Sequence, residues 1–167
     1  MDSNGNDGPV GFSYECEQRV LDIRVNSNNP ANVDLGITEN SILEFDVGYA
    51  SHEGYIWAIV RPSSNVQFIA GSINIFHVYP QALSEGDLIS DNDMWVTGDP
   101  SYVLASNVGT GLFRGAGKKY LGFRVLDDGN TYYGWIPLDV SNSISPYSVG
   151  EYRINYNPGE FIEAGVE

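Results

Sequence analysis

YLGFRVLDDGNTYYGWIPL, residues 120–138, is the stretch of the sequence that decides the fold. Over 121–125 apolar side chains alternate with glycine and arginine, which is the two-residue period of a half-buried strand. Asp128 and Gly129 follow, and 131–140 is a second run rich in aromatic and aliphatic residues. An Asp-Gly pair between two such runs indicates a β-hairpin, because a type I′ turn needs positive φ at both central residues.

Comparable runs occur along most of the chain. Between positions 43 and 49 apolar side chains occupy every second position, and Glu44 and Asp46 stand between them. This pattern predicts a half-buried strand whose inward face ends with Tyr49. From 55 to 60 both faces are apolar, which predicts a central strand covered on both sides. Shorter strands are predicted over 12–16, 20–25, 66–70, 73–79, 150–156 and 161–164.

Helix signals are weak by comparison. The best candidate, 79–88, is interrupted by Pro80 and Gly86. Glycines and prolines fall between the strand-like runs, where turns are needed. Roughly nine to eleven short strands separated by such turns indicate a β-sandwich or a barrel. We predict an all-β fold, an antiparallel and jelly-roll-like β-sandwich, because two packed sheets bury the inward rows.

Length and charge limit the possible functions. The 167 residues correspond to one domain, predicted over 11–167 after a disordered polar leader at 1–10. A net charge of −14 argues against a nucleic-acid partner, which would need clustered Lys and Arg. No apolar run approaches the about 20 residues that span a bilayer, so membrane insertion is not expected.

The same composition bears on localisation. The leader has neither the basic start nor the apolar core of a signal peptide. Lysine is scarce, whereas Asn, Ser, Gly, Thr and Tyr are abundant, as is common in exported β-proteins. We therefore expect a periplasmic, extracellular or cell-surface protein whose export signal has been removed, with a cytoplasmic protein as the alternative.

Catalytic motifs are sparse. Cys16 is flanked by two glutamates, which disfavour a thiolate, so a structural role is expected. His52 and His77 are the two histidines of the chain, too few and too far apart for a zinc site. The pentapeptide Gly-x-Ser-x-Gly of many serine hydrolases is absent.

Paired carboxylates provide one catalytic alternative. Glu44 and Asp46 lie on the same outward strand face, about 7 Å apart. Glycoside hydrolysis uses two carboxyl groups about 5–10 Å apart, so a polysaccharide-acting hydrolase is possible. In a chain with 22 acidic residues, a solvated acidic face explains the pair better.

Two features of the middle of the chain indicate a binding site. Asp91, Asn92 and Asp93 offer oxygen ligands in one loop and are candidate ligands for Ca²⁺, the one cofactor that we consider. The spacing of an EF-hand loop is absent, and a solvated acidic loop is the alternative. Trp95 and Tyr102, in the same loop-rich region, are candidate exposed aromatic contacts for a glycan.

A denser aromatic cluster lies in the second arm of the hairpin. Tyr133 and Trp135 share one face of that strand, and Tyr132 and Ile136 share the other. One of the two faces has to point to the core. Because large aromatic side chains are usually buried in sandwiches, Trp135 is expected to be a core residue.

The C-terminal third resembles a domain of unassigned function in exported bacterial proteins. The resemblance rests on YLGFRV at 120–125, YGWIPL at 133–138 and NPGEFIEAG at 157–165. Members often carry a C-terminal sorting tag and an acidic loop before an early strand; in that loop this chain keeps only Asp34 and Glu39 as acids. The resemblance implies export and a sandwich fold, and it implies no reaction.

Together these features predict a non-catalytic, exported binding or surface-structural module. Its expected partner is a glycan or another cell-surface protein. The hydrolase and a purely structural spacer are the alternatives.

Overall fold

The computed structural model describes residues 23–50, 54–74, 76–96 and 102–167. The predicted leader, the strand predicted at 12–16, Cys16 and His52 lie outside these residues. The described part of the chain contains no helix, and so none that is long and apolar enough to cross a membrane.

The described residues form fifteen strands. The strands are β1 (Ile23–Val25), β2 (Ala31–Asp34), β3 (Ile42–Ala50), β4 (Tyr55–Pro62), β5 (Val66–Ile73), β6 (Val78–Pro80), β7 (Ala82–Leu83), β8 (Leu88–Ile89), β9 (Trp95–Val96), β10 (Tyr102–Ser106), β11 (Lys118–Asp127), β12 (Asn130–Asp139), β13 (Tyr147–Val149), β14 (Arg153–Ile154) and β15 (Ile162–Glu163). The predicted all-β fold is confirmed, but the predicted strand count is too low. Five strands are only two residues long, too short to show an alternating pattern.

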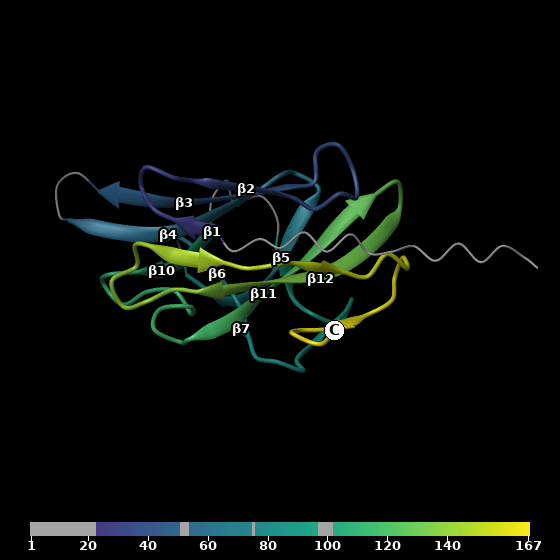
Figure 1. Ribbon diagram of the computed structural model, residues 1–167. Coiled ribbons are helices and arrows are strands. Elements are labelled where there is room, and N and C mark those ends of the chain that lie inside the picture. Colours follow the sequence, from purple (N-terminus) through teal and green to yellow (C-terminus); the bar gives the residue numbers. More distant parts are fainter. Residues whose placement is uncertain (1–22, 51–53, 75, 97–101) are drawn as a thin grey trace, which may run out of the picture.

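Two antiparallel sheets form the body of the protein. The larger sheet has nine strands: β1-β13-β12-β11-β5-β6 lie in a row, and β14, β7 and β9 pair with members of that row. The smaller sheet has four strands in the order β10-β4-β3-β2. Figure 1 shows β2, β3 and β4 on one side of the molecule and β11 and β12 on the other. This layering is that of an antiparallel sandwich.

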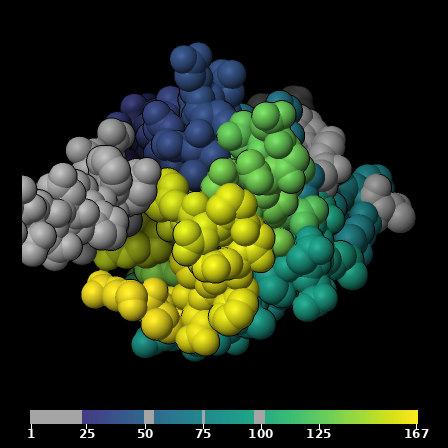
Figure 2. Space-filling model, turned by 90° about the vertical axis from the view of Figure 1, so that its right-hand side faces the viewer, coloured from purple at the N-terminus to yellow at the C-terminus, as the bar shows by residue number. Residues whose placement is uncertain are grey.

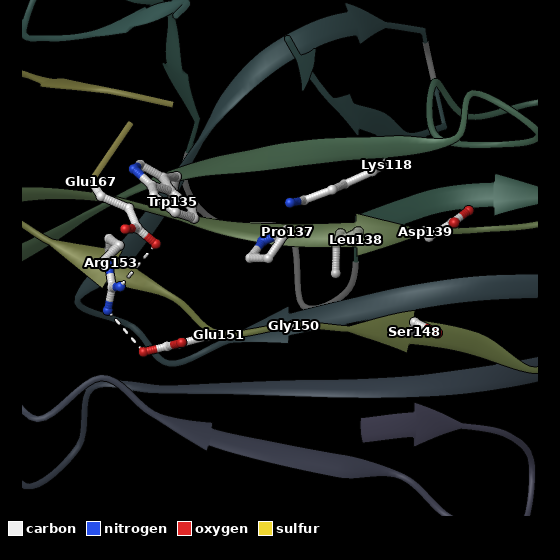
Figure 3. Close-up of a pocket in the computed structure, with 10 residues that line it drawn as sticks. All are labelled: Lys118, Trp135, Pro137, Leu138, Asp139, Ser148, Gly150, Glu151, Arg153 and Glu167. Atoms are coloured by element: carbon white, nitrogen blue, oxygen red, sulfur yellow. Dashed lines mark hydrogen bonds and ion pairs between the residues drawn. The ribbon is translucent and has the colours of Figure 1, made fainter. Parts of the chain in front are cut away.

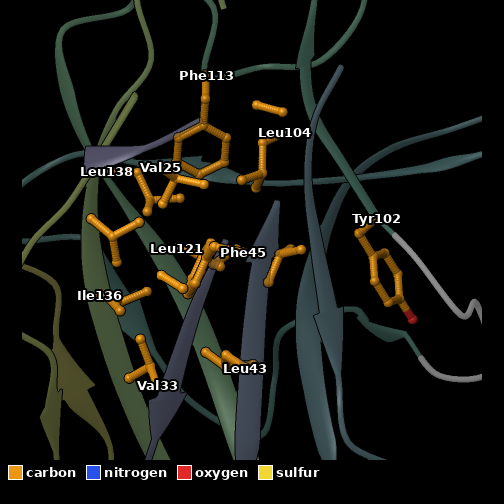
Figure 4. Close-up of a cluster of buried hydrophobic side chains, with 14 of the residues drawn as sticks. Val25, Val33, Leu43, Phe45, Tyr102, Leu104, Phe113, Leu121, Ile136 and Leu138 are labelled. Atoms are coloured by element: carbon orange, nitrogen blue, oxygen red, sulfur yellow. The ribbon is translucent and has the colours of Figure 1, made fainter. Parts of the chain in front are cut away.

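The inward rows of the two sheets form the main core. Leu43 and Phe45 of the smaller sheet face Leu121 and Ile136 of the larger one, and all four are fully buried (Figure 4). The prediction that β4 is a central strand is confirmed, because it lies between β10 and β3. The prediction for Tyr49 is wrong: it is 55% exposed, because the core does not extend to the end of β3.

A buried tyrosine links the two sheets. The Tyr147 hydroxyl, on β13, donates to the backbone carbonyls of Asp46 on β3, at 3.0 Å, and Ile59 on β4, at 3.2 Å. Burial, followed by the nearby Asp46 carboxylate, raises the pKa of this hydroxyl far above its usual range. The hydroxyl therefore stays neutral, and its hydrogen bonds hold the two sheets together.

The β11–β12 hairpin is the longest pairing in the molecule, and it forms as predicted. Asp128 and Gly129 have φ of 44° and 81°, which places both in the left-handed region that a type I′ turn requires. Across the hairpin Phe123 is paired with Gly134. A Cβ at Gly134 would lie 2.4 Å from Phe123 Cζ and 2.5 Å from the Arg153 carbonyl oxygen. Only glycine fits at this position.

The expected strand at 73–79 is wrong in its bounds. β5 runs through the predicted break and ends at Ile73, and the chain then turns before β6. The Asn74 side-chain oxygen stabilises this turn by accepting the backbone N–H groups of Phe76 and His77. His77 is exposed in that turn and is not part of the core.

The outward face of the larger sheet is buried as well. We name the apolar side chains there the outer cluster; its buried members are Ile69, Leu83, Ile89, Tyr120, Tyr133, Trp135 and Ala164. Tyr132 and Ile136 belong to the main core on the opposite face, so both faces of β12 are apolar and covered. Trp135 is thus buried as predicted, but on the outward face of the sheet.

Two segments distant in sequence cover the outer cluster. We name residues 84–94 and 161–165 together the cover. β8 and β15 pair within it, and the Gly86 N–H donates to the Ala164 carbonyl at 2.8 Å. Figure 2 shows the yellow C-terminal segment beside the teal part of the chain. The hollows described next lie at the margins of this cover.

Candidate functional site

A polar hollow of about 330 Å³ lies where the cover meets the turn of the hairpin. We name it the Asp91 pocket; its lining residues are Asp91, Gly129, Asn130, Thr131, Tyr133, Pro158 and Gly159. Three segments contribute: the loop before β9, the start of β12 and the loop before β15. Figure 2 shows the teal, green and yellow parts of the chain meeting on this face.

Asp91 is held in place from behind. Its Oδ1 atom accepts a bond from Arg124 Nη1 at 3.1 Å, and the Tyr133 hydroxyl donates to the same oxygen at 3.4 Å. The Arg124 Nε atom donates to Gln67 Oε1 at 2.7 Å, which fixes the guanidinium. The Asp91 side chain is nevertheless 85% exposed, against 18% for Arg124. The carboxylate therefore faces solvent with a defined orientation.

Tyr133 closes the inner wall of the pocket. Burial and the Asp91 carboxylate, in that order, raise the pKa of its hydroxyl above the usual value, and Arg124 partly opposes them. The hydroxyl is therefore protonated at neutral pH and acts as a hydrogen-bond donor.

Trp95 lies directly behind this arrangement, as a half-buried residue of β9. The Arg124 guanidinium lies over its ring, 4.7 Å from the centroid, and the Tyr133 ring centroid is 5.8 Å away. The indole Nε1 donates to the Ser90 carbonyl at 2.9 Å. Trp95 thus packs beneath Arg124 and Tyr133. Because Arg124 covers part of the indole ring face, that part is not open for stacking on a sugar.

The other two predicted metal ligands, Asn92 and Asp93, form hydrogen bonds within the same loop. Asp93 Oδ2 accepts the backbone N–H of Ser90 at 2.7 Å, and the Asn92 N–H donates to the Ser90 hydroxyl at 3.3 Å. Among the described residues, no three or more His, Cys, Asp and Glu side chains come close enough together to hold a metal ion. Asp91 and Asp93 have separate protein partners, and Ca²⁺ stays a prediction from ligand type alone.

Tyr102 is not part of this site, and its prediction as an exposed contact is wrong. It is 1% exposed and packs edge-on against Phe68, with the ring centroids 5.2 Å apart. All five residues of β10 are buried. The expectation failed because the sequence before Tyr102 resembles a loop, whereas the tyrosine itself begins a strand of the smaller sheet.

Glu44 and Asp46 lie on the outward face of the smaller sheet, as expected. Both carboxylates bind one atom, Arg61 Nη1, at 2.6 Å and 3.2 Å. The guanidinium therefore occupies the space between them that a glycosidic bond would need. The geometry does not favour the hydrolase alternative.

A second hollow, of about 390 Å³, lies at the other end of β12. We name it the Pro137 groove, and Figure 3 shows the residues that line it. β12 changes partner here, from β13 to β14, and the Gly150 N–H donates to the Pro137 carbonyl at 2.9 Å. Its walls carry Lys118 and an ion pair of 2.8 Å between Arg153 and Glu151. Mixed charges and a shallow apolar floor give it no clear ligand chemistry.

Comparison of the chain with protein-family models, with curated proteins and with solved structures found no match. The resemblance to an exported bacterial domain therefore stays a prediction.

Sequence reasoning missed most of the pocket's lining. Thr131 is predicted only as the first residue of the second strand, and Pro158 only as part of the C-terminal motif. One signal was available: a type I′ turn places the residues next to it at the end of the sheet, where polar side chains are free to contact a ligand. The contribution of Arg124 was not visible, because it depends on β5 and β9 lying beside β11.

Proposed function

We propose that this protein is a non-catalytic, exported carbohydrate-binding module that takes up a glycan in the Asp91 pocket. The observation that carries the proposal is an exposed carboxylate, fixed by Arg124 and Tyr133, at the mouth of a polar hollow. The proposal retains the predicted contribution of Trp95, now as a support for the pocket, and drops that of Tyr102.

The chemistry of the lining suits a sugar. Sugar hydroxyls both donate and accept hydrogen bonds, and Asp91, Asn130 and Thr131 supply a strong acceptor, an amide and a hydroxyl within one hollow. Fixed polar groups give specificity because they need no reordering when the ligand arrives. The exposed ring of Pro158 adds a small apolar surface for the C–H face of a sugar.

Export is supported by composition and by the resemblance of the C-terminal third to an exported domain. The scarcity of lysine and the abundance of Asn, Ser, Gly and Tyr fit a protein that works outside the cell. A surface glycan is a ligand available there.

The experiment is a glycan-array screen followed by titration calorimetry with the best oligosaccharide. Thr131→Val removes a hydroxyl from the pocket at nearly constant shape, and we expect binding to weaken about tenfold. Ser148→Ala, in the Pro137 groove, is the matched control and should bind as the wild type does. No binding to any glycan, or equal binding by the Thr131→Val variant, would contradict the proposal. Release of new reducing ends from the bound glycan would contradict its non-catalytic part.

A further inference from the structure

We infer that the Asp91 pocket selects uncharged glycans and rejects acidic ones such as uronates and sulfated sugars. This inference rests on the proposed function and specifies its ligand class. It follows from how charge is distributed in and around the pocket.

The charge that a ligand meets in the pocket is negative. Asp91 Oδ1 is occupied by Arg124 and Tyr133, whereas Oδ2 has no hydrogen-bond partner among the described residues and is open to solvent. An ionised oxygen in this position accepts hydrogen bonds from hydroxyl or amide N–H groups of a neutral sugar. A ligand carboxylate or sulfate at the same place would be repelled and would lose solvation without gaining a partner.

The cation beside the pocket, Arg124, does not line it and already has two side-chain partners. Arg124 is mostly buried, and its Nε and Nη1 atoms bind Gln67 and Asp91. Its guanidinium carbon lies over the Trp95 ring, 4.7 Å from the centroid. An acidic sugar that took the place of Asp91 on Nη1 would break this ion pair, whereas a neutral sugar leaves it intact.

The surroundings add to this preference. The lining residues include no Lys, Arg or His, and the neighbouring positions along the chain carry Asp127, Asp128 and Glu160. The whole chain has a net charge of −14. Polyanionic chains are therefore repelled at a distance as well, most strongly at low ionic strength.

Calorimetry at low and physiological salt tests the inference with two sets of probes. The neutral set contains cello-, xylo-, manno- and chito-hexaoses, and the acidic set contains the hexasaccharides of galacturonan and alginate. We expect at least one neutral probe to bind and the acidic probes to bind at least tenfold more weakly, with the gap wider at low salt.

Asp91→Asn then removes the negative charge of the pocket at nearly constant shape. We expect neutral binding to weaken about tenfold, and uronate binding to strengthen because Arg124 loses its carboxylate partner. Asp139→Asn, at the opposite end of β12, changes the net charge equally and should leave the preference unchanged. Circular dichroism melting confirms that both variants are folded.

The outcomes separate the two proposals. If acidic probes bind as tightly as neutral ones, or if Asp91→Asn leaves the ratio between them unchanged, the inference is wrong while the proposed function stands. If no probe and no arrayed glycan binds, the proposed function is wrong and the inference falls with it.

Discussion

The two sheets differ in what covers their outward faces. The smaller sheet carries on its outward face a small apolar cluster of Ile59, Tyr79 and Val103, and beside it the half-exposed Arg61 pairs with Glu44 and Asp46. The larger sheet buries its outward face under the cover and the outer cluster. The two hollows named above both lie on the covered face, at the margins where the cover stops. The Asp91 pocket thus lies where the covering of the larger sheet is incomplete.

A pair of strand glycines gives the largest expected difference between the two sheets: Gly134 lies on the core-facing side of the larger sheet and Gly48 on the outward side of the smaller one. At Gly134 in the larger sheet an added Cβ would meet the Phe123 ring and the Arg153 backbone at 2.5 Å or less. At Gly48 in the smaller sheet the nearest atoms are 3.5 Å and 3.6 Å away, in ordinary contact. We expect Gly134→Ala to lower the free energy of unfolding by about 3 kcal/mol.

Gly48→Ala is the matched control and should leave stability unchanged or raise it by about 0.5 kcal/mol. Urea unfolding of the two variants measures the difference. Equal destabilisation by both substitutions would show that the two positions are packed alike.

A pair of arginines gives the next difference. Arg124→Met leaves Gln67, a buried side chain, without its donor and removes the cation from the Trp95 ring, so we expect a loss of about 2 kcal/mol. Arg61 is 37% exposed, and Arg61→Met should cost less than about 1 kcal/mol. The Arg61 effect should shrink further in 1 M salt, because exposed ion pairs are screened.

Thermal unfolding at low and high salt compares these two variants. A larger loss for Arg61→Met than for Arg124→Met would contradict the view that the covered face holds the stronger polar contacts.

The contact that joins the two sheets has the smallest expected effect and depends on pH. Tyr147→Phe removes the hydroxyl that bonds Asp46 and Ile59, for a loss of about 1 kcal/mol at neutral pH. The folded state raises the pKa of Tyr147, so above pH of about 10 the unfolded chain loses this proton and the folded chain keeps it. Stability conferred by the group is therefore complete below that pH and declines as pH rises, by at most about 1.4 kcal/mol per pH unit.

Urea unfolding between pH 7 and 11 tests this expectation. The wild type should lose stability more steeply above pH of about 10 than Tyr147→Phe does. Parallel curves would mean that Tyr147 is not held neutral by the fold.

The elements that the sequence predicted well are those whose signal is local. Asp128 and Gly129 define the hairpin turn by their own backbone preferences, and the alternation around Phe45 defines the inward face of β3. The bounds of β5 and the short strands of the cover depend on partners far away in the sequence, so no local pattern marks them. Trp135 shows the limit most clearly: its burial was predictable, but which layer buries it was not.

The residues of the candidate site also divide into those that the sequence identified and those that it did not. Asp91 and Trp95 were identified by residue type and neighbourhood, and the fold brings them to the same place. Tyr102 was assigned to that region by sequence proximity alone, and a strand that begins at this residue takes its side chain into the main core. Arg124 holds Asp91 in place, but in the sequence it is one polar residue of an alternating strand. Its role becomes visible only when β5 and β9 lie beside β11.

The pairing of β8 with β15 also constrains the order in which this protein is assembled. Ile89 leaves the ribosome well before Ile162, the residue with which it pairs. Until then the apolar side of the first segment has no closing strand, and we expect the β8–β15 pair to form only after the C-terminal segment has been synthesised. A chain interrupted during synthesis between these positions would present Leu83 and Ile89 to chaperones or to other nascent chains.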